Sequence, residues 1–367
     1  MTTNQRAWAA TAIGRIEAEF RRSADTHLIP LDLPGHPHVD LYFKDESSHP
    51  TGSLKHRLAR SLFLHALANG WLREGTRVIE ASSGSTAVSE AYFARLLALP
   101  FTAVMPKHTS PEKIAAIEFQ GGACLLVDDA AECHRVAVEL ARTTGGHFMD
   151  QFTYAEQATD WRANNNIAES IFQQLASEPA PMPAWIVCGA GTGGTSATLG
   201  RYVRYRRYPT RILCADPERS AFFDYYRAHR AGEPFGNEIR TASRIEGVGR
   251  PRPESSFIPG CIDEMVRVPD ALSLAGTRYL SARLGRTVGG STGMNLIGVL
   301  AAASLMRRDG QRGSIVTLIC DGGERYRQSY FDPAWYARQG LPIDTADREL
   351  AAVLDGTSPP RVEFAAG

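Results

Sequence analysis

The sequence predicts an α/β fold with mostly parallel sheets. From about residue 56 onward, short apolar runs alternate with helical stretches, the pattern of buried strands covered by helices on both faces. With 367 residues, the chain is long enough for about two domains, each with its own core. Most glycine- or serine-rich motifs follow the strand candidates directly, where parallel sheets gather their ligand sites.

Each element is expected from its local pattern. Apolar runs rich in Val, Ile and Leu predict strands at residues 39–43, 77–79, 101–105, 124–127, 184–188, 211–215 and 314–320. Helical spacing predicts helices at residues 86–97, 111–119, 130–143, 156–176, 195–206, 270–284 and 293–307. Residues 217–265 are less regular and are expected to loop over the site. Residues after about 335 have weak periodicity and are expected to be peripheral.

Composition excludes several function classes. The 40 Lys plus Arg balance the 40 Asp plus Glu, so no bulk charge favours nucleic acid or an anionic membrane. No stretch is apolar enough for a spanning helix, and the N-terminus lacks the apolar stretch of a signal peptide. The six cysteines show neither a CxxC pair nor metal-ligand spacing. We expect free thiols in a reducing cytoplasm and no metal site.

Lysine is scarce, and one lysine stands apart. The four are Lys44, Lys55, Lys107 and Lys113. Lys44 is expected at a solvated strand end, and the last two bracket a polar turn. Lys55 follows a Gly/Pro/Ser turn and opens a helical run, where the positive end of the helix disfavours an ammonium and favours an amine that can form an imine. An exposed helix-start lysine is the ordinary alternative, and the neighbouring His56 is expected on the surface.

A second motif, residues 189–195 (GAGTGGT), lies between an expected strand and an expected helix. Its glycines let the backbone approach an anion, and a helix N-terminus binds one. Gly189, Gly191 and Gly194 also satisfy GxGxxG, and Asp216 ends the next strand. That layout is typical of a dinucleotide site, so NAD is an alternative when the segment is considered alone.

Three further segments combine with Lys55 and this loop: residues 82–86 (SSGST), 289–293 (GGSTG) and 322–326 (GGERY). In this order the motifs resemble the pyridoxal-phosphate enzymes of fold-type II, the tryptophan synthase β-like class, most closely the cysteine synthase and cystathionine β-synthase group. The resemblance covers roughly residues 15–330. It implies two three-layer αβα domains with twisted, mostly parallel sheets and the cofactor, pyridoxal 5′-phosphate, in the cleft between them.

The resemblance also implies domain limits and partners. Residues 1–155 would carry the Schiff-base lysine and the substrate-carboxylate loop, residues 156–335 the cofactor phosphate loop, and residues 336–367 a peripheral tail. The implied partner is a small amino acid, L-cysteine or another β-substituted alanine. Members of the family are usually homodimers.

Site roles follow from the resemblance position by position. Lys55 would be the Schiff-base lysine and the acid or base at Cα, and Ser291 would hydrogen-bond the pyridine nitrogen. The cofactor phosphate would be cradled by Gly191, Thr192, Gly193, Gly194 and Thr195. The substrate would be held by Ser82, Ser83, Gly84, Thr86, Gln151 and Gly247.

Ser291 bears on the reaction type. A neutral hydroxyl leaves the pyridine nitrogen unprotonated and weakens the electron sink. Loss of a β-leaving group as the α-proton departs, giving aminoacrylate, is then favoured over a long-lived carbanion.

The chain departs from the cysteine synthase pattern in three places. Ser85 stands where the family has an asparagine that contacts the cofactor's 3′-oxygen. Residues 164–169 (NNNIAE) replace a Gly-Pro-Glu-Ile stretch, and residues 320–326 (CDGGERY) replace Pro-Ser-Ser/Phe-Gly-Glu-Arg-Tyr. These departures, with the longer C-terminal part, are similar to a bacterial L-cysteine desulfhydrase branch.

The leading hypothesis is therefore β-elimination on L-cysteine to sulfide, pyruvate and ammonia. The alternative is cysteine synthase-like β-replacement, using O-acetylserine or a related β-substituted alanine with sulfide or a thiol. Serine or threonine dehydration, and a binding protein that kept the cofactor pocket without turnover, are further alternatives.

Overall fold

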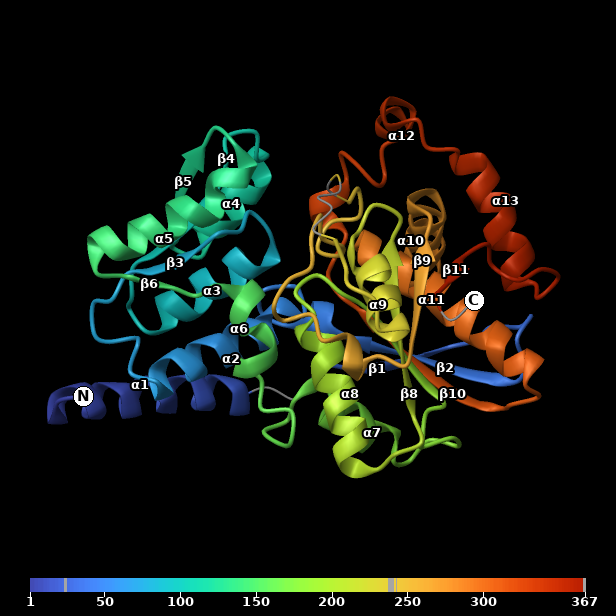
Figure 1. Ribbon diagram of the computed structural model, residues 1–367, viewed down its shortest axis with the longest axis horizontal. Coiled ribbons are helices and arrows are strands. Elements are labelled where there is room, and N and C mark those ends of the chain that lie inside the picture. Colours follow the sequence, from blue (N-terminus) through green and yellow to red (C-terminus); the bar gives the residue numbers. More distant parts are fainter. Residues whose placement is uncertain (23–24, 237–240, 242, 366–367) are drawn as a thin grey trace. The chain divides into compact units, whose positions relative to one another are not determined.

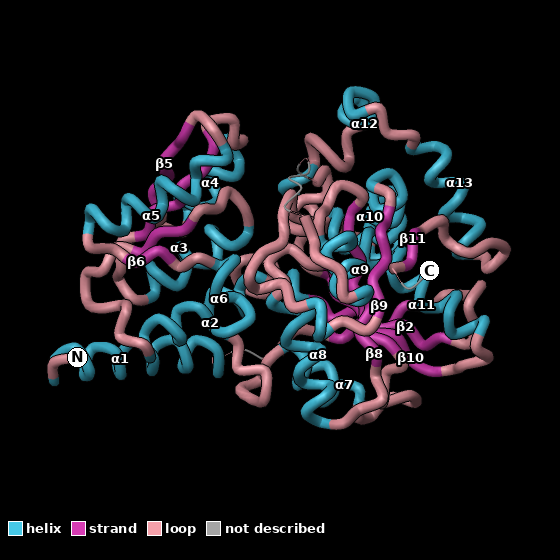
Figure 2. Tube along the Cα trace, viewed as in Figure 1, coloured by secondary structure: helices cyan, strands magenta, loops and turns pink. Residues whose placement is uncertain are grey.

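The chain forms two compact units, each assembled from two stretches of sequence (Figure 1). The computed structural model describes residues 1–22, 25–236, 241 and 243–365. The first unit comprises Met1–Asp25 and Ser48–Thr159, and the second comprises Thr26–Ser47 and Asp160–Gly367. Both combine helices with strands, as predicted (Figure 2).

The first unit is built on a four-stranded parallel sheet with the order β5-β4-β3-β6. The strands are β3 (Val78–Glu80), β4 (Phe101–Pro106), β5 (Ala123–Val127) and β6 (His147–Phe148). The helices are α1 (Thr3–Arg21), α2 (Lys55–Ala68), α3 (Ser85–Leu96), α4 (Pro111–Phe119), α5 (Cys133–Thr144) and α6 (Gln151–Ala158), with a 3-10 turn at Ala130–Glu132.

Alternating residues of these strands face two different helix layers. Val78 packs in one cluster with the apolar faces of α2 and α3, whereas Ile79 packs with α5. Ala103 and Val104 divide in the same way on β4. Because successive strand side chains point to opposite faces, helices cover both sides of this sheet.

The second unit contains a seven-stranded sheet with the order β1-β2-β10-β7-β8-β9-β11. The five central strands are parallel, and the two edge strands are antiparallel to their neighbours. The strands are β1 (Leu28–Leu31), β2 (Val39–Asp45), β7 (Trp185–Gly189), β8 (Arg211–Pro217), β9 (Glu264–Val268), β10 (Gly313–Ile319) and β11 (Glu363–Phe364).

Helices cover both faces of this sheet as well. They are α7 (Ile167–Leu175), α8 (Gly194–Arg206), α9 (Phe222–Ala231), α10 (Asp270–Leu284), α11 (Gly290–Arg308), α12 (Pro333–Gln339) and α13 (Ile343–Leu354), with 3-10 turns at Glu46–Ser48, Pro259–Cys261 and Glu324–Tyr326. Leu213 and Ala215 of β8 pack in the cluster that contains α11, whereas Cys214 between them packs with α9. The nearly all-apolar α11 is correspondingly buried.

The segment 26–47 joins the second unit because β2 pairs with β10 in parallel, from Val39 opposite Gly313 to Asp45 opposite Ile319. The predicted first domain, residues 1–155, had included this segment. Lys44 was expected at a solvated strand end, and this expectation is wrong. Its side chain is fully buried, and Nζ donates to the carbonyl oxygen of Thr26 and to Oε1 of Gln174, each at 2.7 Å.

The helix expected at 156–176 is divided into α6 and α7. Asn164 and Asn165 between them have φ of 65° and 48°, a left-handed conformation that asparagine tolerates. Asn166 then caps α7, because its side chain accepts from the backbone N–H groups of Ala168 at 2.9 Å and Glu169 at 3.1 Å. The asparagine run therefore interrupts the expected helix and starts α7, whereas α6 already ends at Ala158.

Two regions expected to be irregular contain regular elements in their described parts. Residues 217–265 contain α9 and the start of β9. The part after residue 335 was expected to be a peripheral tail, yet α13 buries Ala346, Leu350 and Val353, and β11 pairs with β9 at the sheet edge. The buried residues of α13 recur at helical spacing and complete the second core.

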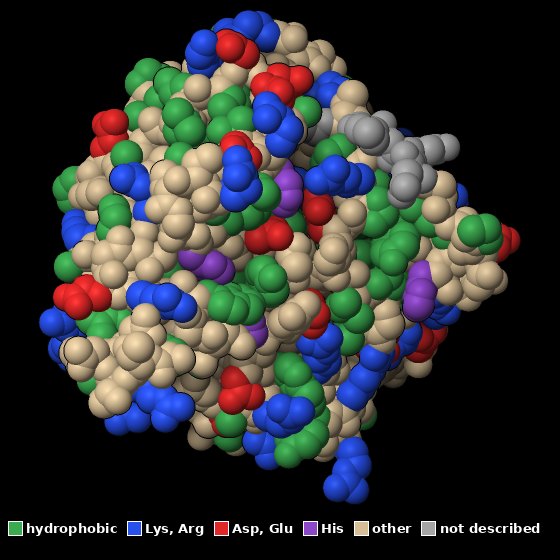
Figure 3. All heavy atoms as spheres, turned by 60° about the vertical axis from the view of Figure 1, so that its left-hand side comes forward, with side chains coloured by type: hydrophobic (Ala, Val, Ile, Leu, Met, Phe, Trp, Pro, Cys, Tyr) green, Lys and Arg blue, Asp and Glu red, His purple; other side chains and the backbone are tan. Residues whose placement is uncertain are grey.

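Acidic and basic side chains are interspersed over the face shown in Figure 3, in keeping with the net charge of zero. Within the described part of the chain, no helix combines the length and apolarity needed to cross a bilayer. All six cysteines are free, as expected.

Candidate functional site

Lys55 is the first residue of α2 and is half-buried. The turn before it includes Gly52, whose φ of 71° suits glycine. The backbone N–H of Lys55 donates to Oγ of Ser53 at 3.3 Å, and the N-cap residue Leu54 has no side-chain hydrogen bond to the helix. The amine expected from the sequence therefore starts a helix, as predicted.

His56 was expected on the surface, and this expectation is wrong. The ring is 5% exposed and stacks on His49 with a centroid distance of 5.0 Å. Its Nδ1 lies 3.2 Å from Oγ1 of Thr51, and its Nε2 lies 3.7 Å from Oε1 of Glu19. Burial lowers the pKa of His56, and Glu19 offsets that effect only in part. A largely neutral His56 thus anchors the turn that presents Lys55.

The serine loop, residues 82–86, connects β3 to α3 in the same unit. The N–H of Gly84 donates to Oγ of Ser82 at 3.2 Å, and Ser83 and Ser85 are half-buried. Thr86, in the first turn of α3, donates through Oγ1 to Oε1 of Gln151 at 2.7 Å. Two residues that are 65 positions apart in sequence are therefore in direct contact.

Gln151 is positioned by the end of β3. Glu80 accepts from the N–H of Ala81 at 2.7 Å and from the N–H of Gln151 at 3.2 Å. Asp150 takes a left-handed conformation with φ of 46° and accepts from the N–H of Thr153 at 3.3 Å, which caps α6. One carboxyl group therefore joins the start of the serine loop to the start of α6.

The sequence reasoning missed Glu80. The available signal was an acid at the end of an apolar strand directly before a serine-rich loop. An acid at the end of a buried strand is itself buried, and a buried carboxylate needs hydrogen-bond donors.

The glycine loop expected to bind phosphate lies between β7 and α8 in the second unit. Gly193 is the N-cap of α8, with φ of 90°, and a Cβ there would lie 2.5 Å from the backbone of Ser256 and Phe257. A Cβ on Gly191 would collide with the carbonyl oxygen of Gly247. Thr192 is buried and accepts from the N–H of Gly194 at 3.3 Å, while Thr195 is half-buried in the first helical turn. Only glycine fits positions 191 and 193.

Three helices in the described chain have glycine at the N-cap, and each belongs to a motif singled out in the sequence. These are α3 after Gly84, α8 after Gly193 and α11 after Gly289. None has a side-chain cap or an acidic residue in its first turn. Helix N-termini without a protein cap fit anionic ligand groups. The residues present therefore fit a phosphorylated cofactor and a carboxylate substrate.

Ser291 is the second residue of α11 and is buried. Asp321, in the segment that departs from the cysteine synthase pattern, lies against the start of this helix. Its carbonyl oxygen accepts from the N–H of Gly289 at 3.1 Å, and its Oδ2 accepts from the hydroxyl of Tyr326 at 2.7 Å. Burial raises the pKa of Asp321 to about 6. Asp321 is therefore mostly ionised at neutral pH, near the positive end of a helix.

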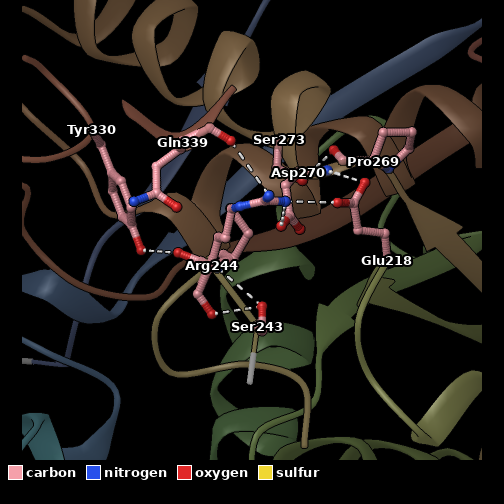
Figure 4. A network of polar contacts seen from close by, with 9 residues as sticks. Glu218, Ser243, Arg244, Pro269, Asp270, Ser273, Tyr330 and Gln339 are labelled. Atoms are coloured by element: carbon pink, nitrogen blue, oxygen red, sulfur yellow. Dashed lines mark hydrogen bonds and ion pairs between the residues drawn. The ribbon is translucent and has the colours of Figure 1, made fainter. Parts of the chain in front are cut away.

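The loop containing Gly247 is held by a polar network (Figure 4). The guanidinium of Arg244 lies 3.0 Å from Oε1 of Glu218 and 3.4 Å from Oδ2 of Asp270. It also donates to the carbonyl oxygen of Gln339 at 3.4 Å. Burial, and next the charge of Glu218, raise the pKa of Asp270 to about 6, against the opposing effect of Arg244. The loop is thus attached to α10 and to the end of α12.

Tyr330 completes this attachment. Its hydroxyl donates to the carbonyl oxygen of Arg244 at 2.9 Å and accepts from the N–H of Glu246 at 2.7 Å. The ring stacks on Tyr326 with a centroid distance of 4.6 Å. Tyr330, which belongs to the expected second domain, therefore fixes the residues on the N-terminal side of Gly247.

The side chain of Asp216 is not accessible to a ribose hydroxyl, as the dinucleotide alternative would require. It is fully buried, and Oδ2 accepts from the N–H of Phe223 at 2.9 Å at the start of α9. Burial raises the pKa of Asp216 to about 7. Its role is to close the start of a helix. Among the described residues, no group of three or more His, Cys, Asp or Glu is arranged to hold a metal ion.

Comparison with known proteins agrees with this geometry. Residues 21–321 match the family described as PALP, pyridoxal-phosphate dependent enzyme. L-cysteine desulfhydrase Cds1 of Mycobacterium tuberculosis is 58% identical over 340 residues, which cover 92% of this chain and 91% of that protein. A putative cysteine synthase of Sinorhizobium fredii is 30% identical, with coverage of 90% and 94%. The crystal structure of O-ureido-L-serine synthase aligns with a TM-score of 0.70 and 25% identity, covering 92% of this chain and 99% of that one.

Proposed function

Since this chain belongs to the family of pyridoxal-phosphate dependent enzymes, we propose that it cleaves L-cysteine by β-elimination. The products are sulfide, pyruvate and ammonia. The observation that carries the proposal is the 58% identity, along nearly the whole chain, to an L-cysteine desulfhydrase. The relative named as a putative cysteine synthase is much less similar, at 30% identity.

The residues would divide the work between the two units. In the first unit, Lys55 would hold the cofactor and move the proton at Cα of the substrate. The serine loop, with Ser82, Ser83, Gly84 and Thr86, would hold the substrate carboxylate together with Gln151. The uncapped N-terminus of α3 supports this assignment because its N–H groups suit a carboxylate.

In the second unit, the loop of Gly191, Thr192, Gly193, Gly194 and Thr195 would hold the cofactor phosphate. Ser291 would meet the pyridine nitrogen, and Gly247 would line the substrate side. Ser85, which belongs to the first unit, would contact the 3′-oxygen of the cofactor. When bound, the cofactor withdraws electron density from Cα of the amino acid. Lys55 would take the α-proton, and the thiolate of the substrate would leave from Cβ. Water would then hydrolyse the released aminoacrylate to pyruvate and ammonia.

Replacement is the second candidate function. In that reaction a thiol or sulfide adds to Cβ after the first leaving group departs, with O-acetylserine or a related β-substituted alanine as the donor. The similarity to the Sinorhizobium fredii protein and to O-ureido-L-serine synthase favours keeping this candidate.

A product assay separates the two reactions. The purified holoenzyme is given L-cysteine alone, and sulfide and pyruvate are measured together. In parallel it is given O-acetylserine with sulfide, and cysteine is measured; L-serine and L-threonine serve as further substrates. Equal amounts of sulfide and pyruvate from cysteine, at a higher rate than any synthesis, are expected. Dominant cysteine formation would overturn the proposal in favour of replacement.

We also propose a homodimer in the cytoplasm. Six free thiols are ordinary for a reducing compartment and support that location. Light scattering on the eluted holoenzyme gives the mass of the assembly, and a mass of one chain would contradict the dimer.

A further inference from the structure

Two fully buried acidic side chains lie behind the serine loop of the first unit. Glu80 ends β3, and Glu90 lies in α3. Glu90 follows Thr86 by four residues, so the two side chains lie on the same face of the helix. The two carboxyl groups contact each other through a side-chain hydrogen bond. Apart from that contact, neither carboxyl oxygen of Glu90 has a hydrogen-bond partner among the described residues.

Their surroundings require a proton. The other charged group that acts on Glu80 is Asp150, which is also acidic, and the charged group that acts on Glu90 is Glu80. Burial is the main cause that raises the pKa of both acids, to about 7 for Glu80 and well above the usual value for Glu90. Two adjacent buried carboxylates cannot both be ionised at neutral pH, because none of the described groups that act on them is a cation that offsets their repulsion. A shared proton turns one of them into a donor.

The proton resides mainly on Glu90. Glu80 already accepts two backbone N–H bonds, from Ala81 and Gln151, and these favour its ionised form. Glu90 has no such donors among the described residues, so it keeps the proton. The O–H of Glu90 then donates a further hydrogen bond to the Glu80 carboxylate, which can accept more than two.

Glu80 is the joint between two parts of the substrate site. Through Ala81 it holds the start of the serine loop, and through the N–H of Gln151 it holds the residue whose Oε1 accepts from Thr86. A rotation of the Glu80 carboxyl would loosen both parts at once. Whatever fixes this carboxyl therefore fixes the distance between the serine loop and Gln151.

We propose that Glu90 is a positioning residue for the substrate carboxylate: it donates a proton to the Glu80 carboxylate and thereby holds the serine loop against Gln151. The inference rests on the proposed function only in naming an amino acid carboxylate as the ligand. A shared proton also limits the pair to one negative charge behind a loop that must accept an anion.

The test compares two substitutions of similar size. Glu90→Gln keeps a donor to Glu80, whereas Glu90→Leu fills the space without one. In the holoenzyme with L-cysteine, Glu90→Leu is expected to raise KM about 10-fold, the effect of one lost hydrogen bond to a charged group, with a smaller change in kcat. Glu90→Gln is expected to stay within about 3-fold of the wild type. Glu118→Gln, on the exposed side of α4, is the control for removing an acid.

Two measurements without substrate keep the proposal testable if Glu90→Leu folds poorly or if cysteine is not the substrate. Infrared spectra at neutral pH are expected to show a protonated carboxylic acid band that is weaker in Glu90→Gln than in the wild-type holoenzyme and unchanged in Glu118→Gln. Asp216, whose pKa burial raises to about 7, contributes to the band in all three proteins. Hydrogen exchange is expected to be faster in Glu90→Leu than in Glu90→Gln for the peptides that contain Ala81 and Gln151.

The outcomes are distinct. A carboxylic acid band of equal strength in the wild type and Glu90→Gln, or the same KM and exchange rates in Glu90→Leu and the wild type, would overturn the positioning role. If the band and the exchange behave as expected but the wild type releases no sulfide from cysteine, the positioning role stands and the proposed function fails.

Discussion

The two units solve a similar problem, the placement of two acids beside a ligand loop, in different ways. In the first unit, the acids behind the serine loop are Glu80 and Glu90, and a proton offsets their repulsion. In the second unit, the acids beside the Gly247 loop are Glu218 and Asp270, and the guanidinium of Arg244 lies between them. Because the first arrangement uses a proton and the second uses a guanidinium, the side chains of one arrangement could not replace those of the other.

The difference has a physical consequence. Because the pKa of Glu80 is about 7, the acid pair of the first unit gains a negative charge as pH rises through neutrality. A guanidinium stays charged at all ordinary pH values, so the second arrangement responds to substitution instead. Although burial raises the pKa of Asp270 to about 6, the group is still mostly ionised at neutral pH and can hold Arg244. The serine loop is therefore held by a titratable contact and the Gly247 loop by a permanent one.

The largest expected effect is the loss of stability when Arg244 is removed from its contact with Glu218 and Asp270. Arg244→Met would leave Glu218 and Asp270 facing each other without a cation, and removing one partner of a buried ion pair costs about 3–5 kcal/mol. Because Arg244 is 18% exposed, we expect the lower end of that range in the free energy of unfolding of the second unit. Chemical denaturation measures this loss of unfolding free energy.

Arg227→Met is the matched control. The side chain of Arg227 is 55% exposed and paired with Asp224 and Glu363, so this variant should change stability by less than about 1 kcal/mol. Equal losses in the two variants would contradict the account.

The pH dependence of stability is the next largest effect. The pKa of Glu80 in the folded chain, about 7, lies above its usual 4.5, so the folded state holds the proton more tightly than the unfolded state. Stability contributed in this way is complete below about pH 4.5 and is lost as pH rises toward 7, at up to about 1.4 kcal/mol per pH unit for each group.

Glu90→Gln should flatten this loss. The difference in unfolding free energy between the wild type and Glu90→Gln isolates the acid pair, because Asp270 and Asp216 titrate in both proteins. Denaturation curves between about pH 5 and pH 7.5 are the measurement. A difference that does not change with pH would mean that the pair carries no shared proton.

The smallest effect is expected where charge is not altered. In Gly193→Ala, the new methyl group would meet the backbone of Ser256 and Phe257, and φ of 90° is unfavourable for alanine. We expect cofactor affinity to fall about 10-fold with little change in pH dependence, equivalent to about 1.4 kcal/mol. Titration of the apoprotein with pyridoxal phosphate measures this affinity. Gly260→Ala, where a Cβ would meet open space, should bind as the wild type does.

The sequence predicted the parallel α/β architecture because its strands are short apolar runs, and such runs report burial on both faces directly. The family resemblance is confirmed by the match over residues 21–321. The helix start at Lys55 and the glycine N-caps of α8 and α11 were also predictable, since turn residues followed by apolar spacing mark helix starts.

Other features depend on contacts between distant parts of the chain. Lys44 can be buried because its ammonium donates hydrogen bonds to the carbonyl oxygen of Thr26 and to Gln174. Both partners are distant from Lys44 in sequence, so the pattern at the end of its strand could not predict them. Glu90 resembles a surface acid in sequence, and only the packing of α3 against α2 and β4 shows that it is enclosed. The role of Tyr330 depends on a backbone contact with Arg244, 86 residues away.

The chain's scarcity of lysine makes its central claim directly measurable. Borohydride reduction of the holoenzyme followed by peptide mapping identifies the amine that holds the cofactor, and the four lysines, Lys44, Lys55, Lys107 and Lys113, lie far enough apart in sequence for the nearest two to be resolved by fragmentation. The account predicts one label, on Lys55, that disappears in Lys55→Ala. A label on another lysine, or none in a protein that still releases sulfide from cysteine, would contradict it.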